Sequence, residues 1–332
     1  MPQPSFPFAA ARVRSKENSL LTKEQLLRMN EAESPEAAMA LLAEYGYETG
    51  DLAPEEYEKC IQKELDKACA FVEEVTPDKA ATDMFFLRFD YHNLKVILKS
   101  KYRGVGGAVR NLVNRGTIDP REMLENVHEK RYSDFPKEMK EALADIDRRF
   151  SVKPDVSYLS FALDRAYAAQ ITAMAKKAKN QVVSEYYRTQ FDFSNITSVI
   201  RLKRAGASRD AYERSMLPGG HIDEYALAKT YDMAEDEALA GLCRGTYARE
   251  LTAAYENYKS TGSFDMFKKA EDEALIRMAS SGRNDMFSAA PVLAYLILKS
   301  KEAEAVRMVM VGKLNGMEPA YIAGLLAGSG AA

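Results

Sequence analysis

The sequence has few of the side chains that most often build metal sites and covalent catalytic centres. The cysteines are few and odd in number: Cys60, Cys69 and Cys243. Their spacing fits no metal-binding motif, which is typical of reduced thiols in a reducing compartment. The histidines are as few: His92, His128 and His221. None has a second histidine four residues away, so neither a zinc site nor a histidine-based triad is expected.

Long apolar runs are also missing. The longest runs from Ala289 to Leu298 and ends at Lys299, well short of the roughly 20 apolar residues that a membrane-spanning helix needs. We expect this run to be a buried helix. The amino-terminal stretch MPQPSFPFAAARVRSKE contains no apolar core long enough for a secretory signal, which predicts a cytoplasmic protein.

A phosphate-binding loop is not evident either. The glycine-rich stretch Arg103 to Gly107 follows a predicted helix instead of a strand, and it lacks the Lys-Ser or Lys-Thr ending of such a loop. We interpret it as a flexible connector. Carboxylate pairs such as Glu73 and Glu74 lie in charged helical stretches, where a solvated face is the usual explanation. The sequence therefore offers no catalytic residue, no cofactor-binding residue and no metal ligand.

What the sequence does contain is typical of a helical globular protein. Of its 332 residues, 46% are hydrophobic and 29% charged, and the net charge of −3 gives no general reason to expect nucleic acid as a partner. Apolar residues recur at spacings of three and four, whereas strict alternation is scarce. Glycine and proline gather between these helical runs. The fold class is predicted to be all-α.

One sixteen-residue pattern occurs three times at nearly equal spacing. It reads FDYHNLKVILKSKYRG at 89–104, FDFSNITSVIRLKRAG at 191–206 and, in degraded form, KEAEAVRMVMVGKLNG at 301–316. The acidic position is held by Asp90, Asp192 and Glu302. The amide three residues later is Asn93 in the first copy and Asn195 in the second, but the third copy has alanine there. The sequence therefore predicts one structural unit used three times.

The phase of the pattern predicts repeats at about 21–117, 118–221 and 222–316, within one domain of 1–332. A residue suited to cap the N-terminus of a helix lies near the start of each predicted repeat: Thr22, Asp119 and Asp223. The ends, 1–20 and 317–332, are out of phase and could close the array by lying beside each other. We expect a pseudo-threefold, funnel-shaped ring, with an open stack of the three repeats as the alternative.

Two roles for the acidic and amide residues of the pattern remain open. Asp90 could be an N-cap, with Phe89 packing on Leu94. Alternatively the helix could run through Asp90, which would place Asp90 and Asn93 at a buried polar contact between helices. Both roles are structural.

Each copy of the pattern ends in basic residues. Those that could form a docking rim for an acidic partner are Lys99, Lys101, Arg103, Arg201, Lys203, Arg204 and Lys313. Two explanations fit them. Cations at a helix C-terminus complement the helix dipole, which stabilises an exposed end by about 0.3 to 1 kcal/mol each. If the repeats close into a ring, the same cations could gather on one rim and bind an acidic surface.

Several stretches together resemble the C subunit of the V-type and A-type ATPases, whose counterpart in eukaryotic vacuolar pumps is called the d subunit. They are FAAARVRSKENSLLTKEQLLRM at the amino terminus, the first two copies of the pattern, and the turn MLPGGHID. The resemblance covers essentially the whole chain. It departs from the family pattern in the third copy, where Ala305 replaces asparagine and Glu302 replaces aspartate.

The resemblance implies a non-catalytic, all-helical, pseudo-threefold subunit without a cofactor. Such a subunit lies on the cytoplasmic face of the proteolipid ring, receives the central stalk and couples ATP hydrolysis or synthesis to proton or sodium transport, with no direct membrane span. Two alternatives remain: a free-standing helical-repeat scaffold that binds an acidic partner, and an enzyme with a site of scattered carboxylates. Binding to the stalk and the proteolipid ring would distinguish the ATPase subunit from the scaffold. Turnover by the isolated chain would indicate the enzyme.

Overall fold

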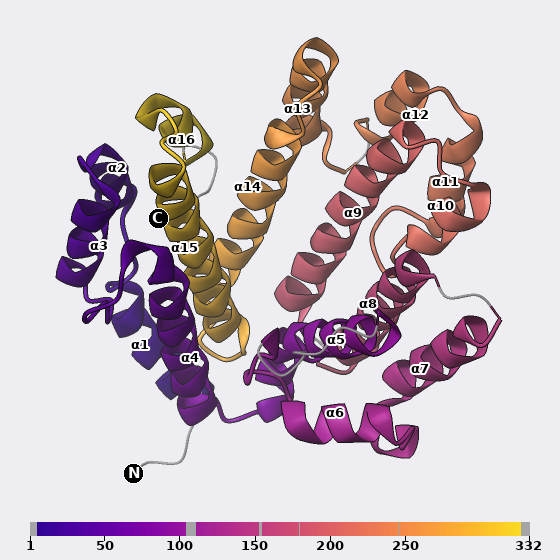
Figure 1. Ribbon diagram of the computed structural model, residues 1–332, viewed down its shortest axis with the longest axis horizontal. Coiled ribbons are helices and arrows are strands. Elements are labelled where there is room, and N and C mark those ends of the chain that lie inside the picture. Colours follow the sequence, from indigo (N-terminus) through magenta and orange to yellow (C-terminus); the bar gives the residue numbers. More distant parts are fainter. Residues whose placement is uncertain (1–4, 104–110, 153–154, 179, 245, 327–332) are drawn as a thin grey trace. The chain divides into compact units, whose positions relative to one another are not determined.

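A computed structural model describes residues 5–103, 111–152, 155–178, 180–244 and 246–326. These residues form helices joined by turns and loops, with no strand among them, so the all-α prediction is confirmed (Figure 1). The glycine-rich connector expected after Arg103 lies mostly outside the described residues. The chain divides into two compact units, one formed by Met1–Thr82 with Arg249–Ala332 and the other by Asp83–Ala248.

The first unit, unit 1, is built around one long helix. This helix, α15, packs against α1, α2, α3, α4, α14 and α16. The helices of the unit are α1 (Phe6–Glu17), α2 (Lys23–Glu31), α3 (Pro35–Glu44), the short η1 (Pro54–Glu56), α4 (Tyr57–Val75), α13 (Ala248–Thr261), α14 (Asp265–Gly282), α15 (Ala290–Leu314) and α16 (Pro319–Leu326). Segments from both ends of the chain thus share one hydrophobic core.

The second unit, unit 2, contains two long helices that carry the first two copies of the pattern. Among its contacts, α8 packs on α7, α9 and α10, and α9 packs on α10 and α12. The helices are α5 (Lys79–Arg103), α6 (Pro120–His128), η3 (Tyr132–Asp134), α7 (Lys137–Phe150), α8 (Val156–Ala178), α9 (Gln181–Arg204), α10 (Arg209–Ser215), α11 (Glu224–Lys229), η4 (Thr230–Asp232) and α12 (Glu235–Leu242).

The expected helix starts are confirmed by their capping hydrogen bonds. Asp119 accepts from the N–H groups of the first turn of α6, and Asp223 does the same for α11. Thr22 caps α2 in a capping box with Gln25. A capping side chain satisfies N–H groups that have no partner inside the helix, so each of these short helices has a defined first residue.

The long helices α5, α9 and α15 run without interruption through the acidic position of each copy. Asp90 is therefore not an N-cap, and the continuous-helix alternative is the one that the structure has. The apolar positions of the three copies are all buried: Leu94, Ile97, Leu98, Ile196, Val199, Ile200, Val306, Val309 and Met310. Burial of these side chains fixes which face of each long helix points into its core.

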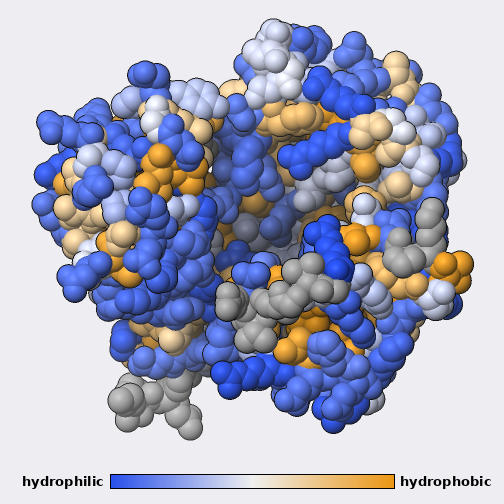
Figure 2. Space-filling view, in the orientation of Figure 1, coloured by the Kyte–Doolittle hydropathy of each residue, from blue (hydrophilic) through white to orange (hydrophobic). Residues whose placement is uncertain are grey.

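The apolar run that begins at Ala289 forms the first turns of α15 and is buried, as predicted. None of the helices in the described part of the chain is both long and apolar enough to cross a membrane. The three cysteines are unbridged and buried. On the face shown in Figure 2, hydrophilic residues predominate and hydrophobic residues form small separate patches.

Candidate functional site

The most regular feature of the structure is a set of buried polar contacts made by the repeated pattern. In the first copy, Asp90 is fully buried on α5. Its carboxylate accepts hydrogen bonds from the backbone N–H of Thr117 at 2.9 Å, from the Thr117 hydroxyl at 2.7 Å and from the N–H of Ile118 at 3.1 Å. Burial raises the pKa of Asp90, and these three donors act in the opposite direction.

The second copy repeats this arrangement on α9. Asp192 is also fully buried, and its carboxylate accepts from the N–H groups of His221 at 2.9 Å and Ile222 at 3.0 Å. The third donor is the hydroxyl of Tyr247, at 2.8 Å, in place of the threonine hydroxyl of the first copy. Each aspartate therefore holds the chain just before a short helix, α6 in one case and α11 in the other.

The asparagines make the second contact of each copy. Asn93 donates to the carbonyl oxygen of Val113 at 2.8 Å and accepts from the N–H of the same residue at 2.9 Å. Asn195 makes the same pair of hydrogen bonds with Leu217, at 3.0 and 2.7 Å. An amide side chain has one donor side and one acceptor side, so it can satisfy both polar groups of one backbone residue.

We expect Asn195→Leu to lower the free energy of unfolding by about 2 kcal/mol, because Leu217 would lose the partner of both its N–H and its carbonyl. Urea denaturation followed by circular dichroism measures the change. Asn18→Leu is the control, since Asn18 is exposed and its side chain bonds to nothing in the described residues; its effect should stay within about 0.5 kcal/mol. An unchanged urea midpoint for Asn195→Leu would contradict the structural role.

Two glycines make room for the aspartates. A Cβ on Gly116 would lie 1.9 Å from Asp90 Oδ1, and a Cβ on Gly220 would lie 2.1 Å from Asp192 Oδ1. Neither distance is compatible with a real carbon atom, so glycine is the residue that allows the carboxylate to reach the backbone N–H groups beyond it.

The third copy differs in chemistry as well as in sequence. Glu302, only 2% exposed, accepts from the N–H of Leu21 at 2.8 Å and from the hydroxyl of Tyr47, and its other partner is Lys299, at 2.6 Å. Leu21 precedes the capped start of α2 as Ile118 precedes that of α6. The position of the missing asparagine, Ala305, is fully buried. Burial, with the Glu302 charge second, raises the pKa of Tyr47.

A lysine eleven residues after each acidic residue makes a further contact. Lys101 donates to the carbonyl of Val127 at 2.9 Å, near the end of α6. Lys203 donates to the backbone carbonyls of Tyr231 and Met233, at 3.0 and 2.5 Å, which follow α11. In the third copy the acceptor is the C-cap residue of α2: Lys313 donates to Ala32.

These contacts together form what we call the two-point clamp: an acidic residue at the start of a short helix and a lysine at its end, both on one long helix. Eleven residues span three turns and about 16 Å of α-helix, so the two clamp residues share one face. The short helices α6, α11 and α2 have six to nine residues. The cation meets the carbonyl end and the anion meets the N–H end, which is the favourable direction at each terminus.

Three of the seven proposed rim cations thus belong to the clamp. Lys101, Lys203 and Lys313 are half-buried clamp residues. Of the others, Arg103, Arg201 and Arg204 are exposed and Lys99 is half-buried. Arg204 lies 3.5 Å from Glu235.

The histidines do not come together. His92 and His128 are exposed, and His221 lies 2.9 Å from Glu185. Within the described ranges, no group of three histidine, cysteine, aspartate or glutamate side chains could hold a metal ion.

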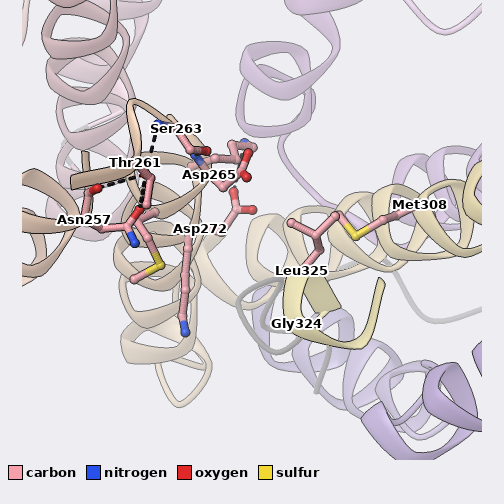
Figure 3. Close-up of a pocket in the computed structure, with 11 residues that line it drawn as sticks. Asn257, Thr261, Ser263, Asp265, Asp272, Met308, Gly324 and Leu325 are labelled. Atoms are coloured by element: carbon pink, nitrogen blue, oxygen red, sulfur yellow. Dashed lines mark hydrogen bonds and ion pairs between the residues drawn. The ribbon is translucent and has the colours of Figure 1, made fainter. Parts of the chain in front are cut away.

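Unit 1 contains a pocket of about 450 Å³ between α13, α14, α15 and α16. Figure 3 shows its polar side, where Asn257, Thr261 and Ser263 bond to one another, and its apolar side, formed by Met308 and Leu325. Both lysines in its wall are already paired: Lys268 with Asp272 at 2.9 Å and Glu271 at 3.1 Å, and Lys269 with Glu273 at 3.9 Å. The polar groups of the lining mostly satisfy one another, so the pocket offers no evident nucleophile and base pair.

Sequence reasoning missed three residues that bond to the acidic clamp residues, Tyr47, Tyr247 and Lys299. It also missed the reason for glycine at positions 116 and 220. The glycines did have a signal, because each stands two residues before an isoleucine at the start of a predicted repeat. Tyr47 and Tyr247 also follow the predicted repeat starts at nearly equal distances, 26 and 25 residues after Leu21 and Ile222.

Comparison with known proteins finds relatives along nearly the whole chain. The model of a family described as ATP synthase (C/AC39) subunit matches residues 9–325. The C subunit of the A-type ATP synthase of Methanocaldococcus jannaschii is 24% identical over 97% of this chain and 86% of the relative. The C subunits of the A-type ATP synthases of Methanothermobacter thermautotrophicus and Halobacterium salinarum are 25% and 27% identical, over 97% and 70% of this chain and 88% and 70% of the relatives.

The family match includes α1 to α16 apart from the ends of the first and last helices. It therefore covers all three copies of the pattern and every residue of the two-point clamp. On this basis the chain belongs to the ATP synthase (C/AC39) subunit family.

Proposed function

We propose that this protein is a non-catalytic central-rotor subunit of a V/A-type ATPase. In this role it couples the central stalk to the proteolipid ring of the membrane sector, so that ATP hydrolysis or synthesis is linked to proton or sodium transport. The observation that carries the proposal is the family match over residues 9–325, together with relatives named as the C subunit of A-type ATP synthases.

The two-point clamp supports a mechanical role. A subunit that transmits torque needs helices that keep their relative positions under load, and each short helix here is held at both ends by one long helix. The third clamp joins residues at opposite ends of the chain. We therefore propose that repeats 21–117, 118–221 and 222–316 close into a funnel-shaped ring, with 1–20 and 317–332 as the closing ends.

We further propose that the subunit lies on the cytoplasmic face of the membrane without spanning it. Of the proposed docking rim, Lys99, Arg103, Arg201 and Arg204 are the cations outside the clamp. Lys99 and Arg103 share the last turns of α5, so a partner surface rich in carboxylates could meet both.

The direct test is co-purification. A tagged full-length chain, expressed with the other ATPase subunits of its own organism, should retain the central stalk subunit and, in detergent, the proteolipid ring. Failure to bind either would contradict the coupler. Capture of an unrelated acidic protein without ATPase subunits would favour the free-standing scaffold instead.

The docking rim has its own test. Lys99→Glu with Arg103→Glu should weaken binding of the ATPase partner subunits on the order of tenfold at low salt, about 1.4 kcal/mol, with a smaller difference at high salt. Lys101 is left unchanged because it belongs to the clamp. Lys140→Glu with Arg121→Glu is the matched control, two exposed cations of α7 and α6. Equal binding by both double variants at low salt would remove the rim from the proposal.

A further inference from the structure

A second pocket, in unit 2, gathers three arginines from three different helices. Its volume is about 380 Å³, and it lies between α7, α8 and α10. Arg149 comes from the last turn of α7, Arg165 from α8 and Arg214 from α10. The one carboxylate of the lining, Asp145, is paired with Arg148, which does not line the pocket.

Tyr158, which is 9% exposed, also lines this pocket. The guanidinium carbon of Arg149 lies 4.2 Å from the ring centroid and that of Arg214 lies 5.1 Å from it. Both distances are within the range of a cation–π contact. Stacking on a ring face holds a planar guanidinium group in place without using its N–H donors.

The three arginines differ in how far their donors are used. Arg165 donates to the carbonyl of Met216 and to Glu224, at 3.1 Å in the second case. Arg214 pairs with Asp210 at 2.6 Å, an exposed carboxylate one turn earlier on the same helix. Arg149 has no ion pair or hydrogen bond from its side chain within the described residues. The pocket therefore holds more positive charge than its own carboxylates compensate.

From this arrangement we infer that the pocket between α7, α8 and α10 binds a phosphate group, with Arg149 and Arg214 as its main ligands. A guanidinium fork matches two oxygens of a phosphate and forms shorter, stronger hydrogen bonds with it than with a neutral acceptor. The ligand class is inorganic phosphate, pyrophosphate or the phosphate chain of a nucleotide. A nucleobase is not expected to be recognised, because the buried tyrosine ring is already covered by two guanidinium groups. This site does not depend on the docking rim or on the coupling role.

Isothermal titration calorimetry of the full-length chain at low salt tests the site with inorganic phosphate, pyrophosphate and ATP as probes. We expect saturable binding of pyrophosphate with a Kd of about 1 mM or tighter. ATP should bind within about threefold of pyrophosphate if only the phosphate chain is held. Arg149→Gln with Arg214→Gln should weaken binding at least about tenfold, since two of the three charges are removed.

Two further variants separate recognition from folding. Arg121→Gln removes an exposed arginine of α6 that does not line the pocket, and it should leave the affinity unchanged. Arg149→Lys keeps the charge but loses the fork, so it should bind more weakly than the wild type and more tightly than the double glutamine variant. Circular dichroism confirms that each variant is folded.

Two results would overturn the inference. The first is the absence of saturable binding of any probe up to about 10 mM at low salt. The second is equal affinity in the wild type and the folded double glutamine variant, which would mean that the arginines only pack on Tyr158. A markedly tighter affinity for ATP than for pyrophosphate would overturn the claim that only phosphate is read.

Discussion

Glu302→Ala should lower the free energy of unfolding by about 3 to 5 kcal/mol, among the largest effects of any single substitution in unit 1. The carboxylate accepts hydrogen bonds from Lys299, Tyr47 and the N–H of Leu21. In the alanine variant all three donors would lose this acceptor. The side chain of Lys299 is only 7% exposed. Its ammonium would keep a single carboxylate, Glu64, at 3.8 Å, so most of the compensation for a buried charge would be lost.

Urea denaturation measures the stability, and hydrogen exchange locates the loss. Because Glu302 joins α15 to the segment that begins at Leu21, the amides of 21–47 should exchange faster in the variant than those of unit 2. Glu304→Ala is the matched control, two residues away on α15. Its carboxylate pairs with Lys301 but is 46% exposed, so the expected loss is within about 1 kcal/mol.

A Glu302→Ala variant as stable as Glu304→Ala would show that the buried network contributes no net stability. Glu302→Gln adds a second comparison. It keeps the shape of the side chain and can still accept from Leu21, but it cannot compensate the charge of Lys299. We expect its stability to lie between the wild type and Glu302→Ala.

The sequence predicted the local structure well because local structure depends on neighbouring residues. The helical class follows from apolar spacing, and the starts at Thr22, Asp119 and Asp223 follow from cap chemistry. The pattern also singled out the recurring aspartate and asparagine as structural residues, although it left open whether Asp90 caps a helix or lies in a buried contact. These features need no knowledge of which helices meet.

The partners of those polar residues could not be derived in the same way. Glu302 bonds to Leu21, 281 residues away, and Tyr247 reaches Asp192 across 55 residues. Nothing in the composition of either segment encodes such a pairing, which depends on how the long helices pack. The same holds for the arginine pocket, whose residues are separated in sequence and come together only where α7, α8 and α10 meet.

The basic residues at the ends of the pattern are a second case in which the partners of a side chain could not be derived from the sequence. From the sequence, Lys101 and Lys99 are alike, two cations near the end of one helix. In the structure the two lysines differ, because α6 ends beside Lys101. The carbonyl of Val127 in α6 accepts a hydrogen bond from Lys101. Burial lowers the pKa of Lys101, as expected of an ammonium whose nearest acceptor is a neutral carbonyl. An interaction surface for a partner is therefore better sought among the cations that the clamp does not use.

Gly220→Ala should lower the free energy of unfolding by about 2 to 4 kcal/mol, although it adds only one methyl group. The new Cβ would lie 2.1 Å from Asp192 Oδ1, so the carboxylate or the loop must move. Either movement breaks the hydrogen bonds to His221 and Ile222 that hold the start of α11. Thermal and urea denaturation measure the loss.

Gly241→Ala is the matched control, because nothing lies within 4 Å of a Cβ at that position and Gly241 belongs to helix α12. It should be neutral or stabilising by up to about 1 kcal/mol, since alanine favours a helix over glycine. A double-mutant cycle then identifies the cause. If the clash with Asp192 is responsible, Asp192→Ala combined with Gly220→Ala should be clearly less destabilising than the sum of the two single variants. Additive losses would mean that Gly220 is required for the backbone conformation of the turn and not for the approach of the carboxylate.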